Sequence, residues 1–307
     1  MEIQIVSGFL GAGKTTFLNQ YLPALGGRTA VIENEFGDIG LDGELLQGDL
    51  PVKELLAGCI CCSLSLDFRR GIKEIWEQYH PQRIVIEPSG VGRLSDIVKA
   101  CNQAKEKEGI DLRITKLIAI VDISLFEEYI DGFGAFYLDQ IEHAGLLLLS
   151  NIDRLPRKEL ARQTACLQEV NPDALIYEGD WRQMDPETLR DLVDMVSDYE
   201  DDPEEIAIET VPADRVFSSV IVRRPKEFVL IELEEILKKL KNEDYGQILR
   251  VKGVVKTSDG GNVHVELTPA SLRLEKLGGT EEKETGCKLI VIGCRLKEEM
   301  IRELLEE

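Results

Sequence analysis

A glycine-rich stretch near the start of the chain has the residue types and spacing of a phosphate-binding loop. The segment GFLGAGKTT contains the pattern G-x-x-x-x-G-K-[ST]. In such a loop, backbone N–H groups turn toward the β-phosphate, the lysine reaches the β- and γ-oxygens, and the hydroxyl ligates Mg²⁺. A glycine turn with a chance lysine is the weaker interpretation, because a strand pattern precedes the segment and a helix pattern follows it. The predicted nucleotide-binding residues here are Gly8, Gly11, Ala12, Gly13, Lys14, Thr15 and Thr16.

A second candidate position lies at the end of another apolar run. The segment RIVIEPSG, residues 83–90, reaches an acidic residue at Glu87 and a glycine at Gly90. We predict that Glu87 holds Mg²⁺ through water and that the N–H of Gly90 senses the γ-phosphate, so Lys14, Thr15 and Glu87 form the catalytic set. Without the upstream loop, an acidic strand end that caps the next helix would be the simpler interpretation.

Three cysteines, Cys59, Cys61 and Cys62, crowd into the short segment GCICC. Thiolates are preferred ligands of Zn²⁺ and also bind Co²⁺, and a tetrahedral site needs three or four such ligands. Neighbouring thiols do not pair easily, and the total of seven cysteines is odd, so disulfides are not expected. We favour a transition-metal site over two alternatives, a buried cluster of small apolar side chains and a redox pair.

The elements that must position these residues follow an alternating pattern over residues 1–200. Short buried strands are expected at 3–6, 30–32, 84–86, 117–121, 146–149 and 175–177. Amphipathic helices are expected at 17–25, 66–79, 94–105, 125–130, 158–170 and 187–199. This alternation predicts an α/β domain, with a P-loop-type parallel sheet covered by helices on both faces.

The pattern changes after an acidic stretch. Residues 198–209 read DYEDDPEEIAIE without an apolar stripe, which favours a solvated linker over 201–213. A small C-terminal α+β domain is predicted over 214–307. Its expected strands are 216–222, 248–256, 263–267 and 289–292, its expected helices are 228–240 and one from Lys297, and residues 277–286 are expected to form a hairpin loop.

The charge balance narrows the class of partner. The chain has 57 acidic and 36 basic residues and a net charge of −21, which repels nucleic acids and anionic membranes. We therefore expect no nucleic-acid and no membrane partner. No apolar run is long enough to span a bilayer and no basic segment precedes the first one, so a cytoplasmic protein is expected.

Four motifs in order resemble the CobW-type GTP-binding metallochaperones: GFLGAGKTT, NEFGDIG at 34–40, GCICC and IEPSG. Weaker similarity continues at 121–122 and 250–253. The resemblance implies a GTPase that binds GTP and Mg²⁺ and carries Zn²⁺ or Co²⁺ on its cysteines. The sequence shows no residue that would orient the attacking water, so slow intrinsic turnover is expected. It also implies delivery to a client metalloenzyme or to a protein of a corrinoid or other cofactor pathway, such as cobalamin biosynthesis. A homodimer is left open.

The segment between the loop and the cysteines suggests how nucleotide and metal communicate. Residues 34–40 lie between the two motifs in the manner of a switch loop. If the γ-phosphate orders this segment, Glu35 moves toward or away from the thiolates and changes metal affinity.

The base-reading motif departs from the family pattern. Where the family has N-K-x-D, this chain has Ser150-Asn151-Ile152-Asp153. Asp153 still favours guanine, because a carboxylate facing N1–H and N2–H₂ leaves adenine unsatisfied. The choice between GTP and ATP stays open, as does the alternative that Asp153 merely caps the turn.

Two other functional classes remain in view. A P-loop small-molecule kinase or ATPase would need an arginine-rich lid, and the only arginine doublets, at 69–70 and 223–224, do not lie beside an obvious one. A thiol redox or iron–sulfur module regulated by nucleotide would also use the cysteines. The three histidines are scattered, so bulk metal storage is not expected.

Overall fold

The computed structural model describes residues 1–36, 52–57, 64–200, 217–223, 225–258, 261–277 and 287–306, without the side chains of 34–36, 52–57 and 64–67. The chain divides into two compact units, Met1–Val211 and Pro212–Glu307. The predicted linker at 201–213 and residues 278–286 of the predicted hairpin loop lie outside the described residues.

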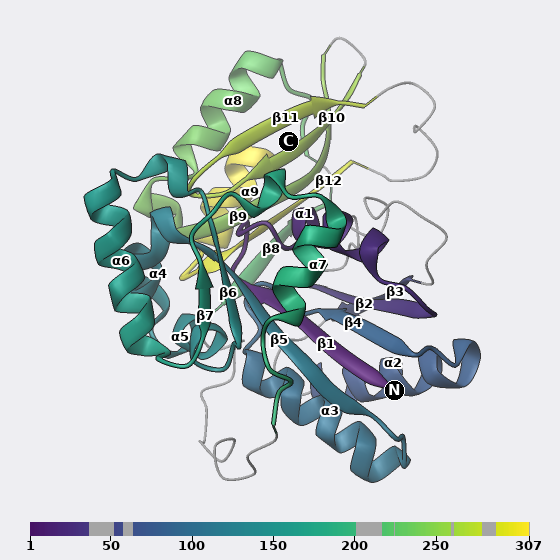
Figure 1. Ribbon diagram of the computed structural model, residues 1–307. Helices are drawn as coiled ribbons and strands as arrows, with labels where there is room; N and C mark the ends of the chain where they lie inside the picture. Colours follow the sequence, from purple (N-terminus) through teal and green to yellow (C-terminus); the bar gives the residue numbers. More distant parts are fainter. Residues whose placement is uncertain are drawn as a thin grey trace. The chain divides into compact units, whose positions relative to one another are not determined.

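The first unit contains a parallel sheet of seven strands in the order β3-β2-β4-β1-β5-β6-β7 (Figure 1). Every described pairing between these strands is parallel, as the strand and helix alternation predicted. The strands are β1 (Glu2–Gly8), β2 (Thr29–Phe36), β3 (Val52–Ala57), β4 (Arg83–Glu87), β5 (Arg113–Asp122), β6 (Leu146–Ser150) and β7 (Leu175–Tyr177).

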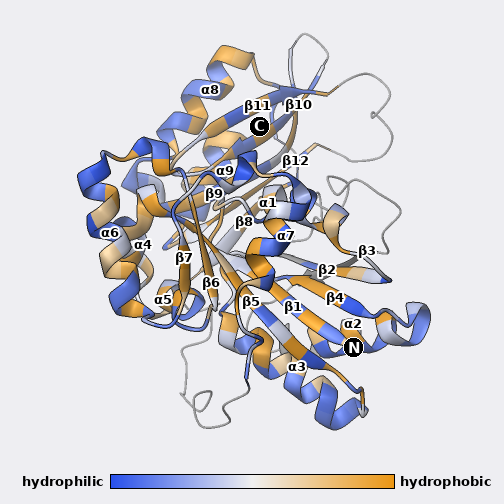
Figure 2. Cartoon of the chain, viewed as in Figure 1, coloured by the Kyte–Doolittle hydropathy of each residue, from blue (hydrophilic) through white to orange (hydrophobic). Residues whose placement is uncertain are grey.

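Helices cover both faces of this sheet, which confirms the predicted α/β class. The helices are α1 (Lys14–Tyr21), α2 (Leu64–Tyr79), α3 (Leu94–Glu108), α4 (Phe126–Phe133), α5 (Ala135–Glu142), α6 (Arg157–Val170) and α7 (Pro186–Asp194). Side chains of α1 and α7 share one core cluster with Val31, Val85 and Leu148 of the strands. The central strands are apolar along most of their length (Figure 2), as expected for strands buried on both faces.

Several predicted boundaries were wrong, each for a local reason. The first helix begins at Lys14 rather than at residue 17. It ends at Tyr21, and a short 3₁₀ turn, Leu22–Ala24, with Pro23 as its second residue, follows it. Strand β3 was not predicted, because VKELLA carries two charges and depends on its pairing with β2. Helix α5 was also missed, and Gly134, with φ 47°, separates it from α4.

The second unit is a five-stranded antiparallel sheet in the order β11-β10-β9-β12-β8, with two helices. Its elements are β8 (Ser218–Val222), α8 (Leu230–Lys239), β9 (Gln247–Lys256), β10 (Asn262–Leu267), β11 (Leu272–Lys276), β12 (Lys288–Cys294) and α9 (Glu298–Leu305). Leu233 and Ile301 of the helices pack with Val251 and Val291 of the sheet in one core. The α+β prediction is confirmed, although β11 was not foreseen. Among the residues described in either unit, no helix is both long and apolar enough to cross a membrane.

Candidate functional site

The predicted phosphate loop joins the carboxyl end of β1 to the first turn of α1. A Cβ atom on Gly8 would lie 2.6 Å from the carbonyl oxygen of Ile120, so only glycine allows the loop to start this close to β5. Gly13 caps α1 with φ 113°, a left-handed conformation that other residues rarely adopt. The backbone N–H groups of this helix start have no partner within the helix and suit an anion.

Lys14 places its charge inside the loop. Its side chain is only 8% exposed, and its Nζ donates hydrogen bonds to the carbonyl oxygens of Gly8 at 2.9 Å and Phe9 at 3.3 Å. Phe9 is in turn fixed by aromatic rings from the α4–α5 hairpin, with centroids 4.6 Å away at Tyr129 and 5.5 Å away at Tyr137. Burial raises the pKa of both tyrosines, so these phenols stay neutral supports of the loop.

Two buried carboxylates lie on the face of the sheet that α1 covers. Val31 and Val85 pack against α1, and two residues later on the same strands stand Glu33 and Glu87. These glutamates are register neighbours and are 4% and 9% exposed. The hydroxyl of Thr15 donates to Oε1 of Glu87 at 3.4 Å.

This arrangement suits a divalent cation. Buried carboxylates on neighbouring strands repel each other unless a cation or a proton compensates them. A hydroxyl with carboxylate oxygens is a donor set that Mg²⁺ prefers. The sequence interpretation named Glu87 but missed Glu33. The available signal was the same in both strands, an acidic residue at the end of an apolar run.

Gly90 lies against the phosphate loop. A Cβ atom on Gly90 would be 2.7 Å from the backbone nitrogen of Leu10 and 2.9 Å from its Cδ2. The segment continues as a turn in which the N–H of Gly92 donates to the carbonyl oxygen of Ser89 at 2.8 Å. The structure therefore brings Lys14, Thr15, Glu87 and Gly90 together at one edge of the sheet.

The base-reading segment follows β6 at the same edge. Ser150 is buried and its hydroxyl donates to the carbonyl oxygen of Val121 at 3.4 Å, while Asn151 Nδ2 donates to Asp122 Oδ2 at 2.6 Å. Both side chains therefore hold the turn in place. Asp153 is different, because its side chain is 78% exposed and lies 3.9 Å from the Arg182 guanidinium.

The alternative role of Asp153 as a helix cap is wrong. The 3₁₀ helix Ile152–Arg154 has Asn151 at its N-cap position, and α6 has Pro156. Asp153 lies inside the short helix with its carboxylate accessible. The geometry leaves it available for a ligand.

Comparison with known proteins identifies the family. Residues 2–178 match the nucleotide-binding domain of CobW/HypB/UreG, and residues 217–307 match the cobalamin synthesis protein cobW C-terminal domain. The chain belongs to the CobW/HypB/UreG family.

Three curated relatives are named zinc chaperones. YeiR of Escherichia coli K12 is 34% identical over 177 residues, which cover 56% of this chain and 53% of YeiR. CobW of Pseudomonas aeruginosa PAO1 is 31% identical over 206 residues, covering 57% of this chain and 55% of that protein. YjiA of E. coli K12 is 27% identical over 270 residues, covering 83% of this chain and 81% of YjiA. The chain thus spans about half the length of the first two relatives.

The structure of this CobW/HypB/UreG chain does not describe the side chains of the predicted transition-metal ligands. Cys59, Cys61 and Cys62 lie outside the described residues. Glu35 belongs to β2, but its side chain lies outside the described part of the structure. Within the described ranges, no group of three or more His, Cys, Asp or Glu side chains is arranged to hold a metal.

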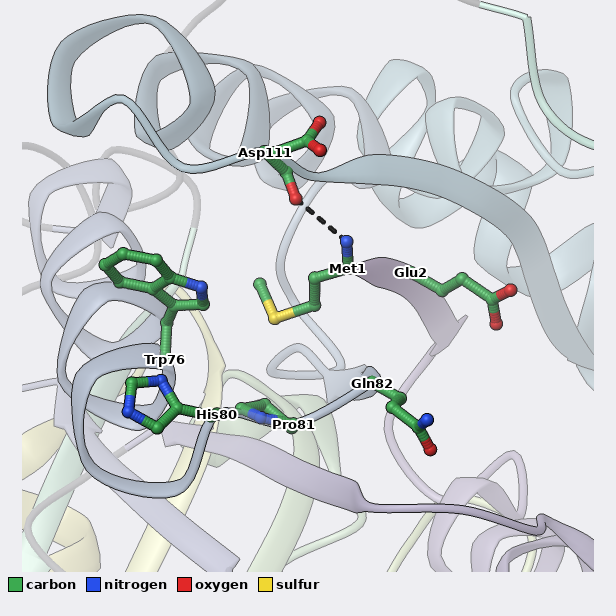
Figure 3. Close-up of a pocket in the computed structure, with 7 residues that line it drawn as sticks. All are labelled: Met1, Glu2, Trp76, His80, Pro81, Gln82 and Asp111. Atoms are coloured by element: carbon green, nitrogen blue, oxygen red, sulfur yellow. Dashed lines mark hydrogen bonds between the residues drawn. The ribbon is translucent and has the colours of Figure 1, made fainter.

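A separate hollow opens at the opposite, amino edge of the sheet. It has a volume of about 430 Å³ and is lined by Met1, Glu2, Trp76, His80, Pro81, Gln82 and Asp111 (Figure 3). Within this lining, the Met1 amino group donates to the carbonyl oxygen of Asp111 at 2.8 Å (Figure 3). None of the predicted site residues lies here, so the hollow is distinct from the phosphate edge.

Proposed function

We propose that this protein is a GTPase that binds a transition metal, Zn²⁺ or Co²⁺, and delivers it to a client metalloprotein in step with GTP hydrolysis. The observation that carries the proposal is the assembly of Lys14, Thr15, Glu87 and Gly90 at the carboxyl edge of a parallel sheet. This edge is where open α/β sheets bind their ligands.

Each of these residues has a distinct role in the proposed reaction. Lys14 binds the β- and γ-phosphate oxygens and offsets their charge, which matters because the chain as a whole carries −21. Thr15 and Glu87 hold Mg²⁺, which when bound neutralises charge on the phosphates. The N–H of Gly90 faces the γ-phosphate. No described residue is assigned to orient the attacking water, so slow intrinsic turnover is expected.

The nucleotide is proposed to be GTP. The accessible Asp153 carboxylate suits the N1–H and N2–H₂ donors of guanine, and Arg182 beside it limits its orientations. Ser150 and Asn151 support the turn instead of framing the base, so we expect a weaker preference for guanine than a full N-K-x-D motif gives.

The cargo is proposed to bind at Cys59, Cys61 and Cys62. The cysteine spacing and the names of the three zinc-chaperone relatives support this proposal. Glu33 supports the cargo proposal as a second buried carboxylate. It lies on β2, and its register neighbour is Glu87 on β4. Strand β2 pairs with β3, and β3 ends at Ala57, directly before the cysteine segment. The nucleotide end of β2 therefore lies beside the strand that leads into the cysteines.

An anaerobic competition titration tests the whole proposal. Zn²⁺, Co²⁺, Ni²⁺ and Fe²⁺ compete for the full chain with Mg²⁺ and either GTP, GDP or ATP present, and metal affinity and hydrolysis are both recorded. We expect one tight site for Zn²⁺ or Co²⁺, hydrolysis without any organic substrate, and different metal affinity with GTP and GDP. Equal affinity with both nucleotides would refute the coupling.

Paired cysteine variants locate the cargo. Replacing Cys61 and Cys62 with serine should remove stoichiometric metal while leaving GTP affinity intact. Cys166→Ser is the matched control, because Cys166 is a free, half-buried cysteine on α6. Full metal affinity in the double variant would place the ligands elsewhere, and a brown, light-absorbing protein would favour an iron–sulfur module.

A further inference from the structure

Helix α5 holds the segment that follows β4. Its residues Phe136, Asp139 and Gln140 have the spacing i, i+3, i+4, so they lie on one helix face. Phe136 stacks under the Arg93 guanidinium at 4.2 Å, and Asp139 accepts hydrogen bonds from the N–H of Ser95 at 3.1 Å and from its hydroxyl at 2.6 Å. This face of α5 therefore fixes the start of α3.

Gln140, on the same face of α5, binds the turn that contains Gly90. Its side-chain Nε2 donates to the carbonyl oxygen of Gly92 at 2.7 Å and to that of Gly90 at 3.3 Å. The side chain is 2% exposed. Only the amide NH₂ can face two carbonyl oxygens, because the reverse orientation would bring three oxygens together.

The other side of the same segment rests on the phosphate loop. Gly90 is so close to the backbone of Leu10 that a Cβ atom would clash. The peptide groups around Gly90 are thus held between the loop on one side and Gln140 on the other. Through the Gly90 carbonyl, Gln140 fixes the peptide that follows Gly90, and through the Gly92 carbonyl it holds the far end of the turn. The preceding peptide, which carries the Gly90 N–H, is held across the same turn by the bond from the Gly92 N–H to the Ser89 carbonyl oxygen.

We propose that Gln140 is a positioning residue that holds the Gly90 peptide ready to recognise the γ-phosphate. This inference rests on the proposed GTP function and deepens it. Gln140 does not touch the nucleotide. It keeps the turn in the binding-competent arrangement, so its loss lowers affinity for the triphosphate in proportion to the fraction of molecules that leave that arrangement.

The experiment compares nucleotides with and without a γ-phosphate. Affinities of the full chain for GDP and for a non-hydrolysable GTP analogue are measured with Mg²⁺ in wild type, Gln140→Leu and Gln140→Glu. We expect Gln140→Leu to weaken analogue binding by about tenfold and GDP binding by much less, since two buried hydrogen bonds are lost. Gln140→Glu should weaken analogue binding further, because its carboxylate would face both carbonyl oxygens and donate to neither.

Gln163→Leu is the matched control. Gln163 is also buried and also uses Nε2, which donates to Glu159 at 3.0 Å, but it lies on α6 outside the segment 88–95. It should keep the wild-type ratio of the two affinities even if stability falls, and thermal melting reports folding of every variant. If Gln140→Leu leaves the ratio of analogue affinity to GDP affinity unchanged, because neither affinity falls or because both fall equally, the inference is overturned. Failure of the wild-type chain itself to bind either nucleotide overturns the proposed function instead.

Discussion

The proposed nucleotide site has a phosphate half, which contains Lys14, Glu33 and Glu87, and a base half, which contains Asp153. The two halves differ in how far their charged residues are buried. Lys14, Glu33 and Glu87 are each less than a tenth exposed, whereas the Asp153 side chain is 78% exposed. Buried charges interact strongly because little water screens them, and an exposed carboxylate is screened. In the proposed site, triphosphate binding therefore depends on buried charges that the fold holds in place, and the choice of base depends on one accessible side chain.

Lys14→Ala should have the largest effect on this comparison. The variant removes the one charged side chain of the segment GFLGAGKTT. We expect GTP affinity to fall by more than ~100-fold. Isothermal titration with GTP and Mg²⁺ measures it. Lys116→Ala is the control, because Lys116 is equally buried but pairs with Asp198 at 3.2 Å, away from the loop. Near-normal GTP binding in Lys14→Ala would refute the assignment of the loop.

Glu87→Gln should have the next largest effect and should act on catalysis more than on binding. The amide keeps the size of the side chain but removes the charge that Thr15 and Mg²⁺ face, so we expect kcat to fall by about 100-fold and the Mg²⁺ requirement to rise. Steady-state hydrolysis across a Mg²⁺ series measures both. Glu108→Gln serves as the control, since that carboxylate pairs with Arg69 and Lys73 at the far end of α3. An unchanged Mg²⁺ dependence in Glu87→Gln would remove it from the metal site.

The sequence predicted the phosphate half better than its surroundings. Gly8, Gly13, Lys14 and Thr15 lie within one short segment, so their relative placement follows from a strand that runs directly into a helix. Glu33 was missed because its role depends on the pairing of β2 with β4. Gln140 was missed because its helix was not predicted, and because the two carbonyls that it binds are about 50 residues away in the chain.

The fold shows the same division between local and distant information. The buried strands β1, β4, β5 and β6 were predicted from apolar runs, which need no partner to be recognised. The missed strands, β3 and β11, are outermost in their sheets and are more polar, so their pairing rather than their composition makes them strands. From the sequence, Ser150 and Asn151 were only departures from the N-K-x-D pattern, and the structure shows that they support the turn.

Asp153→Asn tests the base half directly. The amide can no longer accept from both guanine donors, so we expect the preference for GTP over ATP to fall by about tenfold with little change in total nucleotide affinity. Competition between labelled GTP and ATP measures the ratio. Asp180→Asn is the control, because Asp180 binds the same Arg182 side chain at 3.1 Å without facing the predicted base position. An equal preference loss in both variants would indicate that Arg182, and not Asp153, governs base choice.

Asp96→Asn should have the smallest effect, and it tests whether a partly buried charge at the start of α3 lowers stability. Burial, followed by the nearby Asp139 carboxylate, raises the pKa of Asp96. Because the folded-state pKa lies above the unfolded one, the ionised carboxylate destabilises the fold above that pKa, and this cost disappears as the pH falls through it. Asp96→Asn should therefore raise Tm by about 2 °C or less near pH 8, since loss of a favourable charge at the start of α3 offsets part of the gain. The advantage over wild type should vanish in acid, whereas Asp131→Asn, at an exposed position of α4, should show no such trend. A gain that persists at low pH would mean that the charge of Asp96 is not its cause.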